Sequence, residues 1–223
     1  MAALVLVIGN RNYSSWSLRP WLALRAAGLD FAVERIALYQ PGFEEKLRRF
    51  SATGLVPVLV EDGTAIWESL AICERVAELA PAAGLWPDDP VRRAVARAVA
   101  TEIHGGFTAI RQALPMNFRA CARRRPVLGD DVLRQIARVE EIWTGCRRKC
   151  LAEGAPGPFL FGAFGIADAM WAPVVSRFHT YRIELSPLAR DYADAVLALP
   201  AMREWGAGAV AESETMPEAD ALL

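Results

Sequence analysis

The sequence predicts a mixed α/β domain followed by an all-helical domain. Strand patterns occur only early in the chain: LVLVIG at 4–9 is a continuous apolar run, and VPVLV at 56–60 and TAIW at 64–67 flank a turn. From residue 90 onward the apolar residues recur at helical steps of three and four. Strands first and helices afterwards are typical of two domains and not of one continuous sheet.

The first domain is expected to follow the order β-α-β, a connecting segment and β-β-α. The helix after the first strand has an N-cap in Ser14 or Ser15 and a terminator in Gly28. Apolar and polar residues alternate from 31 to 39, which predicts the second strand. The remaining expected elements are a short helix or irregular arm at 43–50, a hairpin turned at Asp62-Gly63 and a helix at 69–80.

A stretch rich in Pro, Ala, Gly and Asp at 81–89 predicts an exposed linker. The two domains are therefore placed at 1–80 and 90–223. Proline and glycine residues interrupt the second domain, and the segments between them carry a helical period. Its helices are expected at 90–115, 130–152, 166–180, 187–198 and 200–211.

The composition indicates an ordinary globular protein, which we expect in the cytoplasm. A formal net charge of -1 at pH 7 gives no reason to expect binding to nucleic acid or to an anionic membrane. The apolar start of the chain lacks a basic leader and soon meets Asn10 and Arg11, so it is interpreted as a strand and not as a signal peptide. No uninterrupted apolar stretch approaches the ~18 residues of a membrane-spanning helix.

The cysteines and histidines give little material for a metal site. Neither residue type shows the paired spacing of zinc ligands, and the two later cysteines continue the apolar face of a helix. Buried, reduced thiols are the expected state, with no metal centre and no Ser-His-Asp triad. The residues concerned are Cys73, Cys121, Cys146, Cys150, His104 and His179.

The segment NYSSWSLRPW, directly after the first strand, carries a chemical signal. A serine hydroxyl at a helix start, beside free backbone N–H groups, can stabilise an anion such as a thiolate. A hydrogen bond to a charged group contributes ~1.5–3 kcal/mol and the helix end ~0.3–1 kcal/mol, which together lower a thiol pKa by ~1.3–3 units. That shift brings a thiol to about neutrality without a histidine. The alternative for Ser14 or Ser15 is an ordinary helix cap.

Three further motifs are weaker when each is taken alone. In GLVP at 54–57 a cis proline would turn the Val56 backbone outward for pairing with a peptide ligand, whereas a trans proline on an edge strand is the alternative. Glu68 and Ser69, at a strand–helix junction, suit the ammonium and carboxylate of an α-amino acid, or else form a plain cap beside a surface glutamate. GIAD at 165–168 is interpreted as a structural helix cap.

In their order and spacing these motifs resemble those of glutathione transferases, over nearly the whole chain. SSWSLRPWLAL resembles the active-site serine segment of theta-like, zeta-like and related bacterial classes, and GLVP resembles the motif that ends in a cis proline. WESLAI resembles the γ-glutamyl-binding motif, and GAFGIADAMWAP the capping motif of the helical domain. The resemblance implies a thioredoxin-like first domain and a cytoplasmic transferase that conjugates the glutathione thiolate to small hydrophobic electrophiles in detoxification.

The same resemblance implies roles for individual residues. Ser14, or else Ser15, would hydrogen-bond the glutathione sulfur, while Glu68 and Ser69 would bind the γ-glutamyl end. Val56, ahead of Pro57, would pair with the cysteinyl backbone. One departure is Leu55, because relatives often have Lys or Gln there near the glycyl end. The side chains that could replace this contact are Arg11, Gln40 and Lys46.

The electrophile site is expected against the helical domain. Glutathione is the only cosubstrate implied, no metal is required, and a homodimer is the expected assembly. Within this family a zeta-like cis-trans isomerase of maleyl-type acids (maleylacetoacetate or maleylpyruvate) is the main variant, with Arg11 and Arg111 holding the carboxylates. A non-catalytic binding or scaffold protein of the same fold is the other alternative. The wall candidates are Tyr13, Trp16, Phe107, Arg111, Met116 and Phe118.

Overall fold

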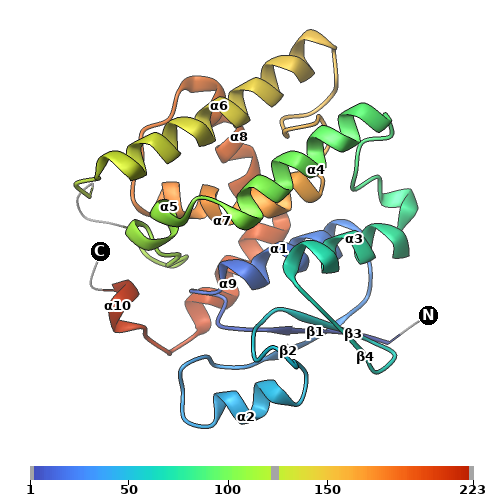
Figure 1. Ribbon diagram of the computed structural model, residues 1–223, viewed down its shortest axis with the longest axis vertical. Helices are drawn as coiled ribbons and strands as arrows, with labels where there is room; N and C mark the ends of the chain where they lie inside the picture. The colour runs from blue at the N-terminus through green and yellow to red at the C-terminus, as the bar shows by residue number, and fades with distance from the viewer. Residues whose placement is uncertain (1–2, 122–125, 221–223) are drawn as a thin grey trace.

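The computed structural model describes residues 3–121 and 126–220 and consists of an N-terminal α/β region and a helical C-terminal region (Figure 1). This is the fold class predicted from the sequence. The sheet has the strand order β2-β1-β3-β4, in which β1 runs parallel to β2 and antiparallel to β3. The strands are β1 (Leu4–Ile8), β2 (Ala32–Arg35), β3 (Val58–Glu61) and β4 (Thr64–Trp67).

Helices cover both faces of the sheet. Figure 1 shows α2 on one face, and α1 and α3 on the other, between the sheet and the C-terminal helices. Strand β1 is apolar throughout because it is buried on both sides: Leu6 joins the main core, whereas Val7 packs with Leu47 of α2. These helices are α1 (Ser15–Ala26), α2 (Phe43–Arg48) and α3 (Ser69–Leu79).

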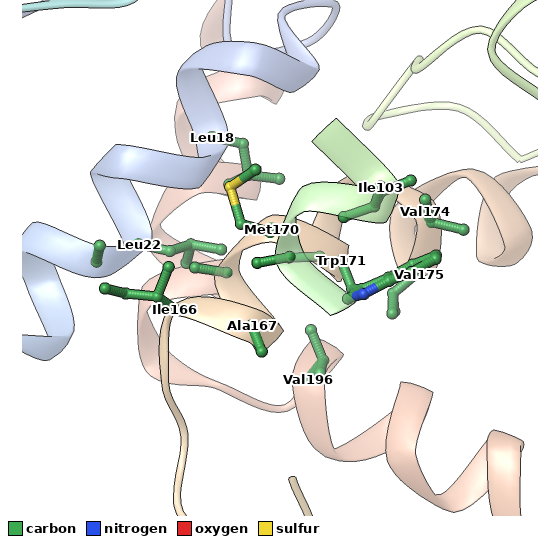
Figure 2. Close-up of a cluster of buried hydrophobic side chains, with 14 of the residues drawn as sticks. Leu18, Leu22, Ile103, Ile166, Ala167, Met170, Trp171, Val174, Val175 and Val196 are labelled. Atoms are coloured by element: carbon green, nitrogen blue, oxygen red, sulfur yellow. The ribbon is translucent and has the colours of Figure 1, made fainter. Parts of the chain in front are cut away.

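The main core continues from α1 into the helical region. Figure 2 shows Leu18 and Leu22 of α1 beside Ile166 and Met170 of α7, with Ile103 of α4 in the same cluster. Every residue of helix α7 except His179 is buried, as expected for the central helix of a bundle. The C-terminal helices are α4 (Pro90–Gly105), α5 (Thr108–Ala113), α6 (Asp130–Ala152), α7 (Ile166–Thr180), α8 (Pro187–Leu197), α9 (Pro200–Ala211) and α10 (Pro217–Asp220).

Two predicted elements differ from the structure, and α10 was not predicted. The strand expected over 31–39 ends at Arg35, because the Leu38 N–H donates to the Asn10 side chain (2.9 Å) and Tyr39 takes a positive φ of 60°. The helix expected over 90–115 breaks at Gly106 and Phe107. A Cβ at Gly106 would lie 2.7 Å from the Glu102 carbonyl oxygen, and Phe107 has a φ of 62°.

The segment expected as an exposed linker is partly buried. It contains a 3-10 turn (Pro81–Ala83) followed by the buried residues Leu85 and Trp86. The Leu85 carbonyl accepts the Ile166 N–H (2.9 Å), at the start of α7. A Cβ at Gly165 would lie 2.6 Å from that carbonyl oxygen, so the close approach of the two backbones requires glycine at the start of this helix.

Asp168 completes the start of α7, as the sequence indicated. Its carboxylate is 1% exposed and accepts the N–H groups of Gly165 (2.9 Å) and Leu160 (3.0 Å). Burial outweighs these hydrogen bonds and raises the pKa of Asp168 from its ordinary 3.8 to about 6. The folded state therefore holds this proton over a pH range in which the unfolded chain has released it.

Asp168→Asn should flatten the dependence of stability on pH between about 4 and 6. In the wild type this group stabilises the fold below pH 4, and up to about 3 kcal/mol of that contribution is lost as the pH rises through 6. Urea unfolding at pH 4.5 and 7.5 measures the difference, with the exposed Asp191→Asn as a matched control. Equal pH dependence in Asp168→Asn and wild type would show that Asp168 is ionised throughout this range.

The remaining expectations concern cysteines, metals and membranes. Cys73 and Cys150 are buried free thiols, Cys146 is half-buried and Cys121 is exposed. Burial raises the pKa of Cys73 to about 12, so this thiol stays protonated and unreactive at neutral pH. Within the described residues, no group of three or more His, Cys, Asp and Glu side chains could hold a metal ion. No helix in the same part of the chain is long and apolar enough to cross a membrane.

Candidate functional site

Ser14 is the N-cap of α1, and the helix begins at Ser15. The Ser14 N–H donates to the Asn10 carbonyl (2.8 Å), which closes the turn after β1. The Ser14 Oγ accepts the Ser17 N–H (3.3 Å) and lies 2.7 Å from the Ser17 Oγ. Ser14 is 7% exposed and lines a cavity, so its hydroxyl is placed at the rim of a ligand-sized space.

A short chain of hydrogen bonds can leave the Ser14 hydroxyl proton available. The Gly9 N–H donates to the Ser17 Oγ (3.1 Å), and the Ser17 hydroxyl can in turn donate to the Ser14 Oγ. In that arrangement Ser14 donates its own proton towards the cavity, where it can meet an anion. Hydrogen bonds in such a chain polarise and strengthen one another.

Ser15 has a different partner. Its Oγ accepts a hydrogen bond from Arg177 of α7 (3.2 Å), and the same guanidinium also donates to the carbonyls of Leu114 and Arg111. Arg177 is buried, and burial lowers its pKa to about 9. Ser15 therefore ties α1 to the helical region, whereas Ser14 bonds only within the start of α1. Both serines line the cavity.

The cavity beside Ser14 has a volume of about 520 Å³. It lies between the start of α1, the segment around Tyr39, helix α2 and the loop before β3. Its wall includes six residues selected from the sequence, and the Val56-Pro57 peptide bond in that loop is cis, as the resemblance implied. The six are Tyr13, Ser14, Ser15, Trp16, Leu55 and Val56, and the others are Leu38, Tyr39, Phe43, Glu44, Leu47, Arg48, Gly54 and Met216.

Glu68 and Ser69 lie at the start of α3, outside this cavity wall. Glu68 has a positive φ of 69°, which is unusual for a residue other than glycine and is often found at functional sites. Its carboxylate lies 3.5 Å from the His104 Nε2 of α4. Ser69 is buried, and its Oγ accepts a long hydrogen bond from Arg19 of α1 (3.4 Å).

Three arginines, of which Arg19 and Arg177 are buried and Arg111 is half-buried, surround Trp16 and Ser15. The guanidinium groups of Arg19 and Arg111 lie over the Trp16 ring, 4.3 Å and 4.8 Å from its centroid. Burial, followed by repulsion from Arg111, lowers the pKa of both Arg19 and Arg177. No Asp or Glu in the described residues forms an ion pair with any of the three. The Nε and Nη2 of Arg19 have no hydrogen-bond partner there either, so this cluster is suited to an anionic ligand.

Several other residues selected from the sequence do not line the cavity. Phe107 and Met116 are buried in the main core, and Phe118 packs against Gly206 of α9. Apolar residues of a core and of a pocket look the same in a sequence, which explains this result. Arg111 donates to carbonyls at the end of α4, including that of Gly106 (3.1 Å).

The residues considered for the glycyl end are also dispersed. Gln40 and Lys46 line a neighbouring hollow, and Arg11 lies over the Trp205 ring beside α9, away from the contacts of Arg111. Arg48, which was not selected, does line the cavity and has an exposed side chain 3.9 Å from Glu44. Arg177, His104 and Met216 were missed as site residues as well, because each comes from a distant part of the chain.

Comparisons with known proteins show what this chain is similar to. The family model for the glutathione S-transferase N-terminal domain matches residues 13–79. Maleylacetoacetate isomerase of Pseudomonas aeruginosa is 30% identical over 210 residues, which cover 87% of this chain and 91% of that protein. The enzyme of the same name from Rattus norvegicus is 28% identical over 192 residues, 79% of each chain.

A solved structure shares the fold over almost the whole length. It is a glutathione transferase homologue from Burkholderia gl BGR1 with bound glutathione, and it superposes with a TM-score of 0.68. The match covers 95% of this chain and 100% of that one, at 23% sequence identity. At this identity the similarity shows the fold, and the chemistry has to be argued from the residues of the site.

Proposed function

This chain belongs to the glutathione transferase family, and on that basis we propose that it binds glutathione and uses the thiolate to isomerise a maleyl-type diacid. The observation that carries the proposal is the combination of the Ser14 hydroxyl, which lines the cavity, with arginines around Trp16 that form no ion pair in the described residues. The hydroxyl would stabilise the glutathione thiolate, which is the nucleophile, and the positive charge would bind a substrate with two carboxylates. Sequence similarity to two maleylacetoacetate isomerases supports this choice of reaction.

Glutathione is proposed to lie along the N-terminal region. Its γ-glutamyl ammonium would meet Glu68, and its α-carboxylate would meet Ser69, with the charge of Arg19 behind that hydroxyl. The cysteinyl backbone would pair with Val56, and the sulfur would face Ser14. The exposed guanidinium of Arg48 is the side chain in the cavity wall best suited to the glycyl carboxylate.

The isomerisation needs only reversible addition of the thiolate. The sulfur bonds to one carbon of the cis double bond, and the displaced electron pair moves to the conjugated carbonyl oxygen. The remaining C–C single bond rotates, the electron pair returns, and the C–S bond breaks to release the trans acid and the thiolate. Arg111 and Arg177 would stabilise the negative charge that develops on the substrate. No oxidant or reductant is consumed.

Conjugation of glutathione to a small apolar electrophile is the second candidate. It is favoured by the apolar side chains that line the cavity beside Ser14, among them Leu38, Phe43 and Met216. A panel of a maleyl acid, a chloronitrobenzene and a hydroperoxide, each with and without glutathione, separates the two reactions. Activity with none of them, despite glutathione binding, would favour the non-catalytic alternative.

We expect glutathione at 100 times its Kd to raise the melting temperature by about 5 to 10 °C, because it binds only the folded state. Ser69→Ala should weaken this binding several-fold, while the exposed Thr101→Ala should not change it. Calorimetric titration and thermal melts provide the measurements. Neither heat nor a melting shift at millimolar glutathione would exclude the proposed function, and full binding by Ser69→Ala would exclude the proposed position of the γ-glutamyl end.

A homodimer in the cytoplasm is proposed as the working state. Exposed apolar side chains support association: Trp67 on the edge strand β4, and Val91 and Val95 on α4. Two-fold association is the commonest assembly of soluble oligomers. Light scattering at micromolar concentration measures the mass directly, and a monomer would exclude this proposal.

A further inference from the structure

The last described stretch of the chain, 212–220, turns back from α9 and ends in α10, beside the loop that joins β1 to α1 (Figure 1). Met216, between the two helices, lines the same cavity as Ser14. The wall of the proposed glutathione site is therefore completed by a residue about 200 positions away from the first helix.

The C-terminal part of this segment, residues 216–220, is called its tip, and Tyr13 makes most of the hydrogen bonds that hold it. The Tyr13 hydroxyl donates to the Asp220 carboxylate (3.0 Å) and accepts the Met216 N–H (3.1 Å) and a hydrogen bond from Arg119 (3.3 Å). Asn117 also donates to Asp220 (2.6 Å). Tyr13 itself lines the cavity and directly precedes Ser14, so the position of the tip is linked to the position of the nucleophile loop.

The other end of the segment, residues 212–214, is called its root, and it is held more firmly. The Glu212 carboxylate is buried and accepts the N–H groups of Arg11 (2.7 Å) and Asn12 (3.1 Å). Arg119 donates to the Glu212 and Glu214 carbonyls. Breaking the root would leave the buried Asn12 N–H without its partner, the Glu212 carboxylate, whereas the bonds at the tip are all partly buried, so water can replace them. The segment can therefore open at its tip while its root stays in place.

We propose that residues 212–220 form a lid over the acceptor side of the cavity, that Tyr13 and Asp220 are its latch, and that Met216 determines which acceptor groups fit. The proposal rests on the proposed function for the identity of the ligand. The acceptor group on the glutathione sulfur enters and leaves when the latch opens, and Met216 packs against it when the latch is closed. Met216 has the flexible, apolar side chain that suits a variable acceptor.

The latch is tested in the ligand-free protein by hydrogen exchange of fragments that cover 212–220. Asp220→Ala should raise their exchange rate about tenfold, and Asp220→Asn should stay close to wild type, because an amide oxygen still accepts from Tyr13 and Asn117. The melting temperature and the shift caused by glutathione should not change. A wild-type segment that already exchanges like an unfolded chain, or equal rates in Asp220→Ala and wild type, would overturn the latch.

The role of Met216 is tested by binding alone, with S-methylglutathione and S-hexylglutathione as probes. The longer chain should bind the wild type more tightly, and Met216→Ala should reduce this preference about three- to tenfold by removing part of the apolar wall. Affinity for S-methylglutathione should remain within about twofold. An unchanged preference would overturn the assignment of Met216. If neither probe binds the wild type, the proposed function fails, while the exchange experiment still decides whether the latch exists.

Discussion

Ser14→Ala should lower turnover at pH 7 by about 10- to 100-fold while the affinity for glutathione changes little. A hydrogen bond to a charged group contributes ~1.5–3 kcal/mol, so its loss should raise the pKa of the bound thiol by about one to two units. The structure allows this role, because Ser17 can donate to the Ser14 Oγ, and Ser14 can then donate its own proton into the cavity that it lines. The deficit should shrink as the pH rises past the new pKa, since solvent then ionises the thiol unaided.

The two neighbouring serines provide matched comparisons for Ser14→Ala. Ser15→Ala removes the acceptor of a buried Arg177 hydrogen bond, so it should chiefly lower stability, by about 1–3 kcal/mol. Ser17→Ala removes the donor behind Ser14 and should raise the thiol pKa by less than Ser14→Ala does. A pH–rate profile for each variant makes the comparison. A shift of the thiol pKa in Ser15→Ala alone would mean that Ser15, and not Ser14, bonds the sulfur. If no variant shifts this pKa, the thiolate must be stabilised by backbone N–H groups or by Arg19.

The α/β-then-α order was predictable because its signals are local. Strand β1 is apolar at every position since both faces are covered, and helix α6 is bounded by breakers at the predicted residues. The errors occur where a distant contact overrides a local pattern. The 31–39 strand stops because the side chain of Asn10 captures the Leu38 N–H, and the 81–89 segment is partly buried because α7 packs onto Leu85.

The same distinction between local patterns and distant contacts applies to the residues of the candidate site. Ser14 and Val56 were predictable because a short motif around each one specifies its local backbone. Arg177 and Met216 were not, since they reach the site from α7 and from beyond α9, and a single sequence does not record which helices meet. Their contribution is also what distinguishes this site from a generic apolar pocket: Arg177 adds buried charge and Met216 adds a wall that can move.

Arg111 provides the test of whether that charge selects the substrate. Arg111→Gln should lower kcat/KM for a maleyl acid by about 10- to 100-fold, and change kcat/KM for a neutral chloronitrobenzene by less than about threefold. The glutamine amide can still donate to a carbonyl at the end of α4, so the loss should be mainly one of charge. Arg111 is less buried than Arg177, and its guanidinium lies over the ring of Trp16. Trp16 lines the cavity, so we expect Arg111 to be the arginine that meets a substrate carboxylate.

Two further variants separate recognition from folding in this experiment. Arg111→Lys keeps the charge without the planar fork and should recover part of the activity on the acid, while the exposed Arg134→Gln on α6 should behave as wild type. Activity of the wild type on the acid should also decline with added salt more steeply than that of Arg111→Gln, because screening acts on the charge that the variant lacks. Equal losses on the acid and on the neutral electrophile would mean that Arg111 positions Trp16 and the end of α4, and that the substrate carboxylates are bound elsewhere.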